Sequence, residues 1–375
     1  MLKRIACFII CVPLCFGAFI RAYAFSDEIS AKGAVLYCVE TGETLYEKNP
    51  HLRLSMASTT KIMTSLLALE ENTPNRLLTV SKEAVNVEGT SSGLKVGDKV
   101  YLEDAVKCML LESGNEAANV VALSLSGTFG AFAERMNKRA AEIGMKNTSF
   151  VTPSGLDAKS HYTTAYDMAL LGAASSRNAD FMKICSLQSD DIEVSGRKVS
   201  LYNHNRLLRE LEGCVGMKTG FTKKSGRCLV TSTVRGGITL ICVTLNAPND
   251  WSDHKKLVEY GFSNVKKVVI EPKINACLPV TGGNRKTVSV SSHSAEIVLP
   301  KGCGREDIYY KIYMKKFAYA PVEGGENVGY IDYYCKGRLL KRQLIFAVES
   351  ADMRMCKKES LWDTFCAFFN NLFGW

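Results

Sequence analysis

The sequence predicts a mixed α and β domain followed by a small all-β domain, and three observations lead to this prediction. The chain has 375 residues, which corresponds to about two domains of ~150 residues each. Strand-like stretches enclose a long helical block between residues 34 and 260, and the helical periodicity disappears after about Pro272. Hydrophobic residues make up 46% and charged residues 23% of the chain, which excludes a disordered or fibrous protein.

The first domain is expected over residues 25–268 and begins with two short strands around a Thr-Gly turn. A helix should follow over about 58–71, because its apolar residues recur at helical spacing. Residues 226–245 contain two β-rich runs around a Gly-Gly pair, which predicts a hairpin. The remaining helices are expected at 103–111, 117–125 and 130–143, within 161–187, and at 250–260.

The second domain is expected over residues 272–350. Its apolar and polar residues alternate in short runs, and Gly or Pro stands between the runs. This spacing is typical of a small all-β module of about 80 residues. The runs are KTVSVSS, AEIVLPK, DIYYKIYM, NVGYIDYY and RQLIFAVES.

Residues 1–24 have the pattern of an export signal. Lys3 and Arg4 supply the positive start, and an uncharged apolar run extends to Ile20. A small-x-small cleavage site ends at Ala24. The alternative is an uncleaved membrane anchor, but the run is shorter than the ~20 residues that a spanning helix needs. We therefore expect an exported protein.

The C-terminal residues 357–375 combine a basic start with a broad aromatic face. Leu361, Phe365, Phe368 and Leu372 recur at intervals of three and four residues, which predicts an amphipathic helix. Such a helix suits the headgroup boundary of a membrane, so we expect a peripheral anchor at the outer face of the cytoplasmic membrane. The alternatives are docking on the protein itself and a dimer contact.

Charge and cysteine content argue against nucleic acid and metal. The formal net charge of +9 is small and dispersed, which does not indicate a nucleic-acid partner. The 14 cysteines include no CxxC pair, and the five histidines are scattered, so we expect neither a metal centre nor a cofactor. Cys228 and Cys242 lie inside apolar runs, where cysteine behaves as a small buried hydrophobe.

The tetrapeptide Ser58-Thr59-Thr60-Lys61 is the first candidate for chemistry. Residues three apart on a helix lie on one face, so Lys61 can reach the Ser58 hydroxyl and act as its base. Lysine is a base only when neutral, and the helix N-terminus together with a second buried cation would lower its pKa. Alone, this spacing is a weak signal, because a helix cap followed by a surface lysine has the same pattern.

Two further motifs strengthen the prediction. Ser113-Gly114-Asn115 stands between two helical stretches, so its hydroxyl and amide can face a substrate. Lys218-Thr219-Gly220 leads into the β-rich region, where a substrate backbone can pair along a strand edge. Each alone is also compatible with an ordinary turn, but SxxK, a Ser-x-Asn element and KTG in this order form a known catalytic set.

With these motifs the chain resembles the low-molecular-mass penicillin-binding proteins that act as serine-type D-alanyl-D-alanine carboxypeptidases. The resemblance covers essentially the whole chain, including Ala320–Ile331 and the aromatic tail. It implies a β-lactamase/transpeptidase-like domain with a central antiparallel sheet, helices on both faces and a helical subdomain, followed by a β-sandwich. The stretches that carry it are SMASTTKIMT, LLESGNEAAN, TPSGLD, HYTTAYDMA, NHNRLL and GMKTGFTKKSGRCLV.

The resemblance also implies roles for individual residues. Ser58 would be the acylated nucleophile, Lys61 its general base and Ser113 a proton shuttle. The substrate-binding residues would be Asn115, Lys218, Thr219 and Gly220. The backbone N–H groups of Ser58 and Phe221 would form the oxyanion hole. Phe221 departs from the histidine found in some relatives, which makes a side-chain role there doubtful.

The implied reaction removes the terminal D-alanine from peptidoglycan stem peptides, and β-lactams would be covalent inhibitors. One alternative is a DD-endopeptidase that cuts cross-links. A class A-like β-lactamase is a weaker alternative, because we find no ExxLN-type run between Ser113 and Lys218 to activate water for deacylation. A wall-binding protein with an inactive site is another alternative, but every motif residue is present.

Overall fold

The computed structural model describes residues 28–71, 73, 76–354, and six residues between 365 and 372. The expected export signal lies outside the described residues, as does most of the expected C-terminal helix. The six described residues of the tail are helical, and Phe365, Phe368 and Leu372 among them are exposed. Within the part of the chain that the structure describes, no helix has both the length and the apolar character needed to cross a membrane.

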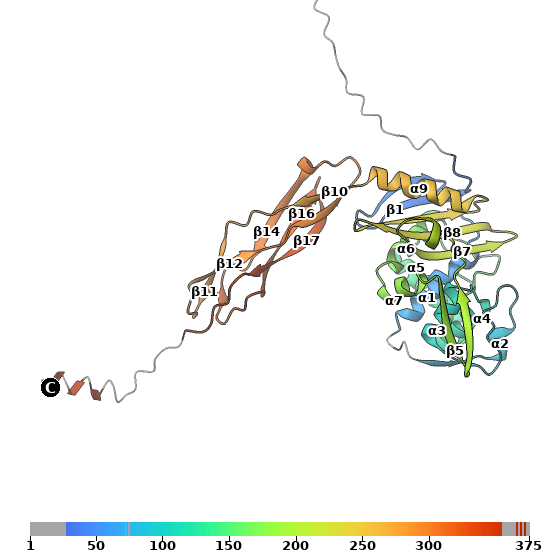
Figure 1. The fold of residues 1–375 in the computed structure, drawn as a ribbon, viewed down its shortest axis with the longest axis horizontal. Helices are drawn as coiled ribbons and strands as arrows, with labels where there is room; N and C mark the ends of the chain where they lie inside the picture. The colour runs from blue at the N-terminus through green and yellow to red at the C-terminus, as the bar shows by residue number, and fades with distance from the viewer. Residues whose placement is uncertain are drawn as a thin grey trace, which may run out of the picture.

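A five-stranded antiparallel sheet forms the centre of the first domain (Figure 1). Both expected hairpins lie in this sheet, and the last strand along its edge carries the KTG motif. In spatial order the strands are β2 (Glu43–Lys48), β1 (Gly33–Cys38), β9 (Ile238–Leu245), β8 (Gly226–Arg235) and β7 (Cys214–Thr222).

Helices cover both faces of this sheet. Side chains alternate between the two faces of a strand, so Val35 of β1 joins the larger apolar cluster while Ala34 and Leu36 join a second one. The larger cluster contains the helical block, and the second contains the α9 helix (Asp250–Asn264). Figure 1 shows α9 along one side of the sheet and the other helices across from it. The expected fold class is therefore confirmed.

The helical block agrees with the expected segments except at its start and at two short helices, Lys82–Val85 and Leu207–Glu210, which the sequence did not predict. The first helix begins as a 3-10 turn, η1, and becomes α-helical at Lys61. The helices before α9 are η1 (Ala57–Thr60), α1 (Lys61–Leu69), α2 (Lys82–Val85), α3 (Leu102–Leu110), α4 (Asn115–Ser126), α5 (Phe129–Ile143), α6 (Ala165–Ser175), α7 (Ala179–Cys185) and α8 (Leu207–Glu210).

Two small hairpins were missing from the sequence-based expectation. The strands β3 (Leu77–Thr79) and β4 (Lys99–Tyr101) pair with each other, as do β5 (Ser189–Val194) and β6 (Arg197–Tyr202). The second hairpin has alternating burial and a turn at Ser195 and Gly196. Alternation on both sides of a glycine turn is an ordinary hairpin signal.

The C-terminal part of the chain consists of strands around one apolar cluster of its own. A six-stranded sheet and the pair β10–β13 both contribute side chains to this cluster. The strand β10 already begins at Lys266 and pairs with β13, so we propose that the second domain begins there rather than at residue 272. The strands are β10 (Lys266–Ile270), β11 (Cys277–Thr281), β12 (Thr287–Ser291), β13 (Ala295–Leu299), β14 (Ile308–Met314), β15 (Ala318–Tyr319), β16 (Asn327–Cys335) and β17 (Arg338–Ala347).

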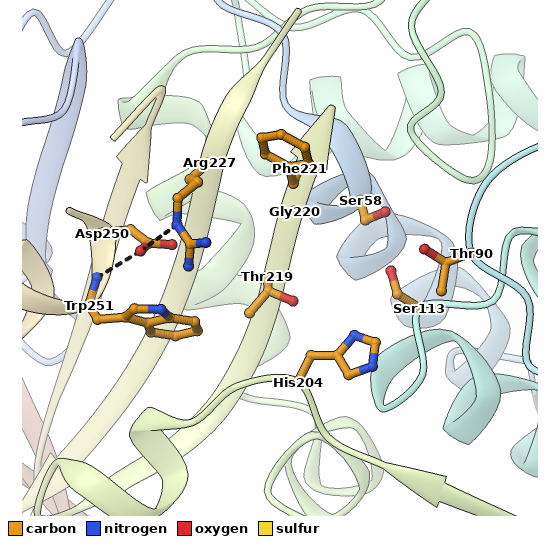
Figure 2. A pocket seen from close by; sticks show the side chains of 10 residues that line it. All are labelled: Ser58, Thr90, Ser113, His204, Thr219, Gly220, Phe221, Arg227, Asp250 and Trp251. Carbon is orange, nitrogen blue, oxygen red and sulfur yellow. Dashed lines mark hydrogen bonds and ion pairs between the residues drawn. The ribbon is translucent and has the colours of Figure 1, made fainter. Parts of the chain in front are cut away.

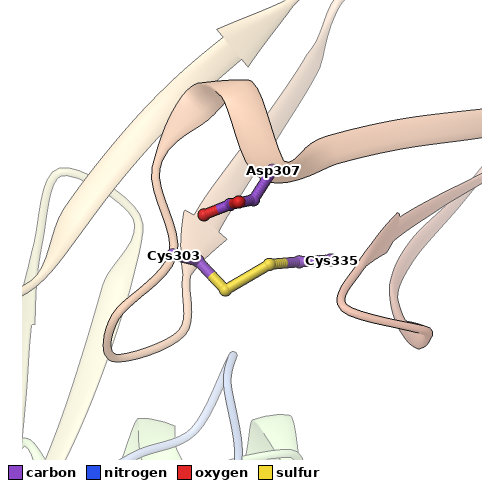
Figure 3. Close-up of side chains that lie close together, drawn as sticks. All are labelled: Cys303, Asp307 and Cys335. Atoms are coloured by element: carbon purple, nitrogen blue, oxygen red, sulfur yellow. A yellow bond between two sulfur atoms is a disulfide. The ribbon is translucent and has the colours of Figure 1, made fainter.

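A disulfide between Cys303 and Cys335 ties a loop of this module to the end of β16 (Figure 3). Asp307 lies beside the two sulfur atoms, and this is the one metal-like cluster among the described residues. Because its sulfur atoms are bonded to each other, the cluster is a structural cross-link. Nearby, Glu43 of β2 accepts hydrogen bonds from the Lys301 N–H (2.9 Å) and from Arg338 (3.0 Å), which join the two domains. Cys228 and Cys242 are buried as expected.

Candidate active site

A strained turn places Ser58 at the start of the first helix. Ala57 has a φ of 47°, a conformation that residues other than glycine rarely adopt. The backbone of Gly155 packs against this turn, because a Cβ at that position would overlap the Ala57 carbonyl oxygen. The close approach therefore requires glycine in the TPSGLD stretch, and the loop supports the turn that presents Ser58.

A buried histidine fixes the same loop to η1. The Val151 N–H donates to His161 Nδ1 (3.0 Å), so His161 Nε2 carries the proton and donates to Thr60 Oγ1 (2.8 Å). The Thr60 hydroxyl in turn donates to the Ala57 carbonyl (2.9 Å). Burial lowers the pKa of His161 to about 4, so the ring is neutral at pH 7.

The Lys61 amine is completely buried and has three oxygen neighbours. Its Nζ lies 3.0 Å from Ser58 Oγ, 2.8 Å from Asn115 Oδ1 and 2.8 Å from the Ser154 carbonyl oxygen. An amide or carbonyl oxygen can only accept a hydrogen bond, whereas a hydroxyl can also donate. A neutral amine therefore donates to the two carbonyl-type oxygens and keeps its lone pair for the Ser58 hydroxyl.

Burial and a neighbouring charge favour this neutral form. Burial lowers the pKa of Lys61 well below that of an ordinary lysine, and the positive charge of Lys218 lowers it further. Glu116 acts in the opposite direction and has the smallest effect of the three. Burial also lowers the pKa of Lys218, to about 7. The expectation of a second cation near Lys61 thus agrees with the structure.

The Ser113-Gly114-Asn115 turn brings the side chains of Ser113 and Asn115 close to Ser58 and Lys61. Ser113 has a φ of 65° and is nearly buried. The Asn115 side chain is fixed at both ends, because its Nδ2 donates to the Glu88 carbonyl (2.7 Å) while its Oδ1 accepts from Lys61. The amide orientation is therefore determined by its partners.

The edge strand β7 closes the site from the other side. A Cβ on Gly220 would lie 3.0 Å from the Ser58 backbone nitrogen, a separation so tight that the neighbouring backbone would have to shift. Glycine at this position lets β7 approach the start of η1. The N–H of Phe221, the next residue, belongs to the same stretch of backbone, and the Phe221 side chain is 65% exposed.

One pocket of about 320 Å³ contains these motifs (Figure 2). Ser58, Thr90 and Ser113 lie at one end, and Arg227, Asp250 and Trp251 lie at the other, with Thr219 between them. Lys61 and Lys218 lie behind its wall, because both are buried. The residues that line it are Ser58, Thr90, Ser113, His204, Thr219, Gly220, Phe221, Arg227, Asp250 and Trp251.

Five of the residues that line this pocket were not predicted from the sequence. His204 and Arg227 lie in the NHNRLL and GRCLV stretches. These stretches carry the family resemblance, but no role was predicted for either residue. His204 lies 3.4 Å from Glu112, and burial together with Lys218 lowers its pKa. Thr90, Asp250 and Trp251 gave no motif signal, because loops and a helix start bring them to the pocket only in the folded chain.

A serine hydroxyl beside a buried amine, facing a pocket along a strand edge, can attack a carbonyl carbon and become acylated. The fold and the site thus define a serine hydrolase that works through an acyl-enzyme. A profile of the peptidase S11 family, described as D-alanyl-D-alanine carboxypeptidase, matches residues 21–249. The chain belongs to this family.

Individual relatives agree with this assignment. The D-alanyl-D-alanine carboxypeptidase DacF of Bacillus subtilis is 31% identical over 85% of each chain, and DacC of Escherichia coli is 29% identical over 87% of this chain and 86% of its own. The structure of penicillin binding protein 5 from Haemophilus influenzae is similar with a TM-score of 0.63 at 28% identity, covering 87% of this chain and 98% of that one. The Streptomyces K15 DD-transpeptidase covers 63% of this chain, with a TM-score of 0.61 at 29% identity.

Proposed function

We propose that this protein removes the terminal D-alanine from peptidoglycan stem peptides through an acyl-enzyme on Ser58. The observation that carries the proposal is the position of the buried Lys61 amine, 3.0 Å from the Ser58 hydroxyl. Its two other neighbours are oxygens that can only accept. The family to which the chain belongs supports the choice of substrate.

In the first half of the reaction, neutral Lys61 takes the proton of the Ser58 hydroxyl as the oxygen bonds to the carbonyl carbon of the D-Ala–D-Ala amide. The C–N bond then breaks, and the leaving amine receives the proton, with Ser113 as the shuttle. Free D-alanine leaves, and the rest of the stem stays as an ester on Ser58. In the second half, water attacks the ester, its proton returns to the serine oxygen, and the shortened stem is released.

The negative charge of the tetrahedral intermediate needs two donors. The backbone N–H groups of Ser58 and Phe221 are suited to this role, because the glycine at position 220 brings the two backbone segments together. Loss of one such donor typically lowers kcat by about a hundredfold or more. Asn115 would hold the substrate amide, and Thr219 would bind the terminal residue beside Lys218 and Gly220.

A β-lactam ring offers a similar amide, so penicillin should acylate Ser58. The test is mass spectrometry of the intact protein after treatment with benzylpenicillin, followed by mapping of the adduct. We expect one adduct on the peptide containing Ser58 and none in Ser58→Ala. Ser65→Ala is the matched control, because Ser65 is a buried serine of α1 whose hydroxyl has no partner among the described residues. An adduct that persists in Ser58→Ala would contradict the proposal.

The same enzyme preparation separates the alternatives. Release of D-alanine from a monomeric pentapeptide, with little cleavage of a cross-linked dimer, is the expected result. Preferred cleavage of the dimer would indicate an endopeptidase, and rapid turnover of benzylpenicillin would indicate a β-lactamase.

We further propose that the protein acts outside the cytoplasm, where its substrate lies, and is peripherally attached to the membrane by residues 357–375. The exposed side chains of Phe365, Phe368 and Leu372 support an apolar contact surface in this segment. A protein truncated before residue 357 should no longer sediment with membranes and should keep its activity on soluble peptide. Continued sedimentation would contradict the anchor.

A further inference from the structure

We propose that the end of the β module away from the first domain lies against an anionic phospholipid surface, through Phe317, Tyr319 and the basic side chains beside them. The inference rests on the membrane attachment proposed above and adds a second contact to it. A tail alone holds a protein at a membrane without fixing its orientation. A contact on the folded module would also determine the direction in which the module extends from the lipid.

Three segments of the chain meet at this end of the module. The short strand β15 pairs with β11. The last described residues before the tail return to the same place, because Met353 forms a β-bridge with Gly283 and the Arg354 N–H donates to the Gly282 carbonyl (2.8 Å). Figure 1 shows β11 at the end of the module opposite the first domain. We call the three segments, residues 282–286, 315–321 and 349–354, the distal tip.

Exposed apolar side chains gather in the distal tip. Tyr319 is 70% exposed, Met353 64% and Phe317 49%. The rings of Phe317 and Tyr319 contact each other edge to face, with their centres 5.3 Å apart. Tyrosine is enriched where a membrane meets water, because its apolar ring and polar hydroxyl suit the level of the headgroups. The distal tip therefore offers an apolar contact of the kind that an interfacial surface uses.

The distal tip is also basic. Its three segments contain five basic and two acidic residues. Lys315 and Arg285 have acidic partners. The other three, Lys286, Lys316 and Arg354, are exposed and form no ion pair with another described residue. Unpaired basic residues beside exposed rings complement a membrane whose headgroups are anionic, since such a surface attracts nearby lysine and arginine.

The start of the proposed anchor brings the distal tip close to the membrane. The anchor begins at residue 357, three residues after Arg354, and three residues of extended chain span about 10 Å at most. Attraction between exposed charges acts over about the same distance at 0.1 M salt. Two exposed rings alone are too small for stable attachment, which commonly takes two signals. The truncated protein should therefore still be released from membranes.

The test measures binding of the protein, with its tail intact, to vesicles of phosphatidylcholine with and without phosphatidylglycerol. The variant Phe317→Ala with Tyr319→Ala should bind vesicles that contain phosphatidylglycerol about tenfold more weakly, because apolar contact area is lost. The variant Lys286→Gln with Lys316→Gln should lose about tenfold on the same vesicles and change little on pure phosphatidylcholine. Both variants should keep their activity on a soluble peptide, which shows that they are folded.

Tyr101→Ala with Tyr202→Ala is the matched control. These two tyrosines of the first domain are 49% and 62% exposed, close to the values for Phe317 and Tyr319, and their removal should leave vesicle binding unchanged. Hydrogen exchange then locates the contact, because the amides of residues 315–321 should exchange more slowly when vesicles are added.

Unchanged binding in both distal-tip variants, or amide exchange in residues 315–321 that vesicles do not slow, would overturn the inference while leaving the tail as the anchor. Exchange that slows with protein concentration in the absence of vesicles would overturn it in favour of contact between two copies of the chain. Failure of the unmodified protein to bind either kind of vesicle would contradict the proposed membrane attachment and the inference with it.

Discussion

Two buried lysines distinguish the first domain of this protein from its β module. In the first domain Lys61 and Lys218 are buried, and the pKa of each lies below that of an ordinary lysine. In the β module most ion pairs lie at the surface, such as Lys315 with Glu326 and Arg285 with Glu349. Ion pairs at the surface contribute little to the free energy of unfolding. A buried lysine that has no carboxylate partner lowers this free energy.

This difference indicates where the chemistry lies. A buried amine destabilises a fold and is retained when it has a function. In agreement with this, perturbed pKa values cluster at functional sites. The first domain also contains the strained turn at Ala57 and the pocket beside it. The β module is joined to it through Glu43, and none of its residues lines the described pocket. Substitutions in the two domains should therefore have different consequences.

The largest difference is expected for lysines. Lys61→Ala removes the base and should lower kcat/KM by about a thousandfold or more. Lys311→Ala removes an exposed lysine of the β module, which lies 5.5 Å from the centre of the Tyr334 ring, and should leave the rate unchanged. Steady-state kinetics on a D-Ala–D-Ala peptide measures both. A Lys61→Ala enzyme with near-normal rates would remove the proposed base from the mechanism.

Two glycines give the next comparison. Gly220→Ala pushes β7 away from the Ser58 backbone nitrogen and should lower kcat about a hundredfold, because an oxyanion donor is displaced. Gly329→Ala in the β module would overlap the Tyr313 carbonyl oxygen. It should lower the melting temperature while the folded enzyme keeps its kcat. If Gly220→Ala lowered only stability, the role of the close approach in catalysis would be contradicted.

The smallest effect is a pH dependence of stability in the first domain. The pKa of His161 is about 4 in the fold and should be near 6.5 in the unfolded chain. Below pH 6.5 the unfolded state binds the extra proton, so the free energy of unfolding falls as the pH drops from 6.5 to 4. The loss from this residue is on the order of 3 kcal/mol. Denaturant titrations at pH 7 and pH 4.5 should show a smaller loss for His161→Gln than for the unmodified protein.

Much of the fold and the catalytic motifs could be predicted from the sequence. Apolar periodicity predicted α3 and α5, and the β-rich runs predicted β8 and β9, because these segments bury one face or a whole strand. Fixed spacing predicted the Ser58–Lys61 contact, since it is local to one helical turn. We propose an earlier start for the second domain than the sequence predicts, because β10 is a short strand whose partner β13 lies far along the chain.

The remaining pocket residues could not be predicted for a similar reason. Arg227 and Trp251 meet only because β8 and α9 pack together, and no local pattern reports such a contact. His161 lies in a stretch that carries the family resemblance. Its hydrogen bond to Thr60, however, joins residues 101 positions apart, so spacing along the chain could not predict it. Tertiary packing, rather than spacing along the chain, determines the wall of the pocket opposite Ser58.

The most direct test of the mechanism is an NMR titration of the Lys61 side chain in the intact protein. Isotope-labelled lysine would report its protonation, and Lys61→Arg would assign the signal. The account predicts that the Lys61 amine is neutral at the pH of maximal acylation rate and that the rate falls as this amine becomes protonated at lower pH. A Lys61 amine that is fully protonated at the pH of maximal rate would contradict its role as the base for Ser58.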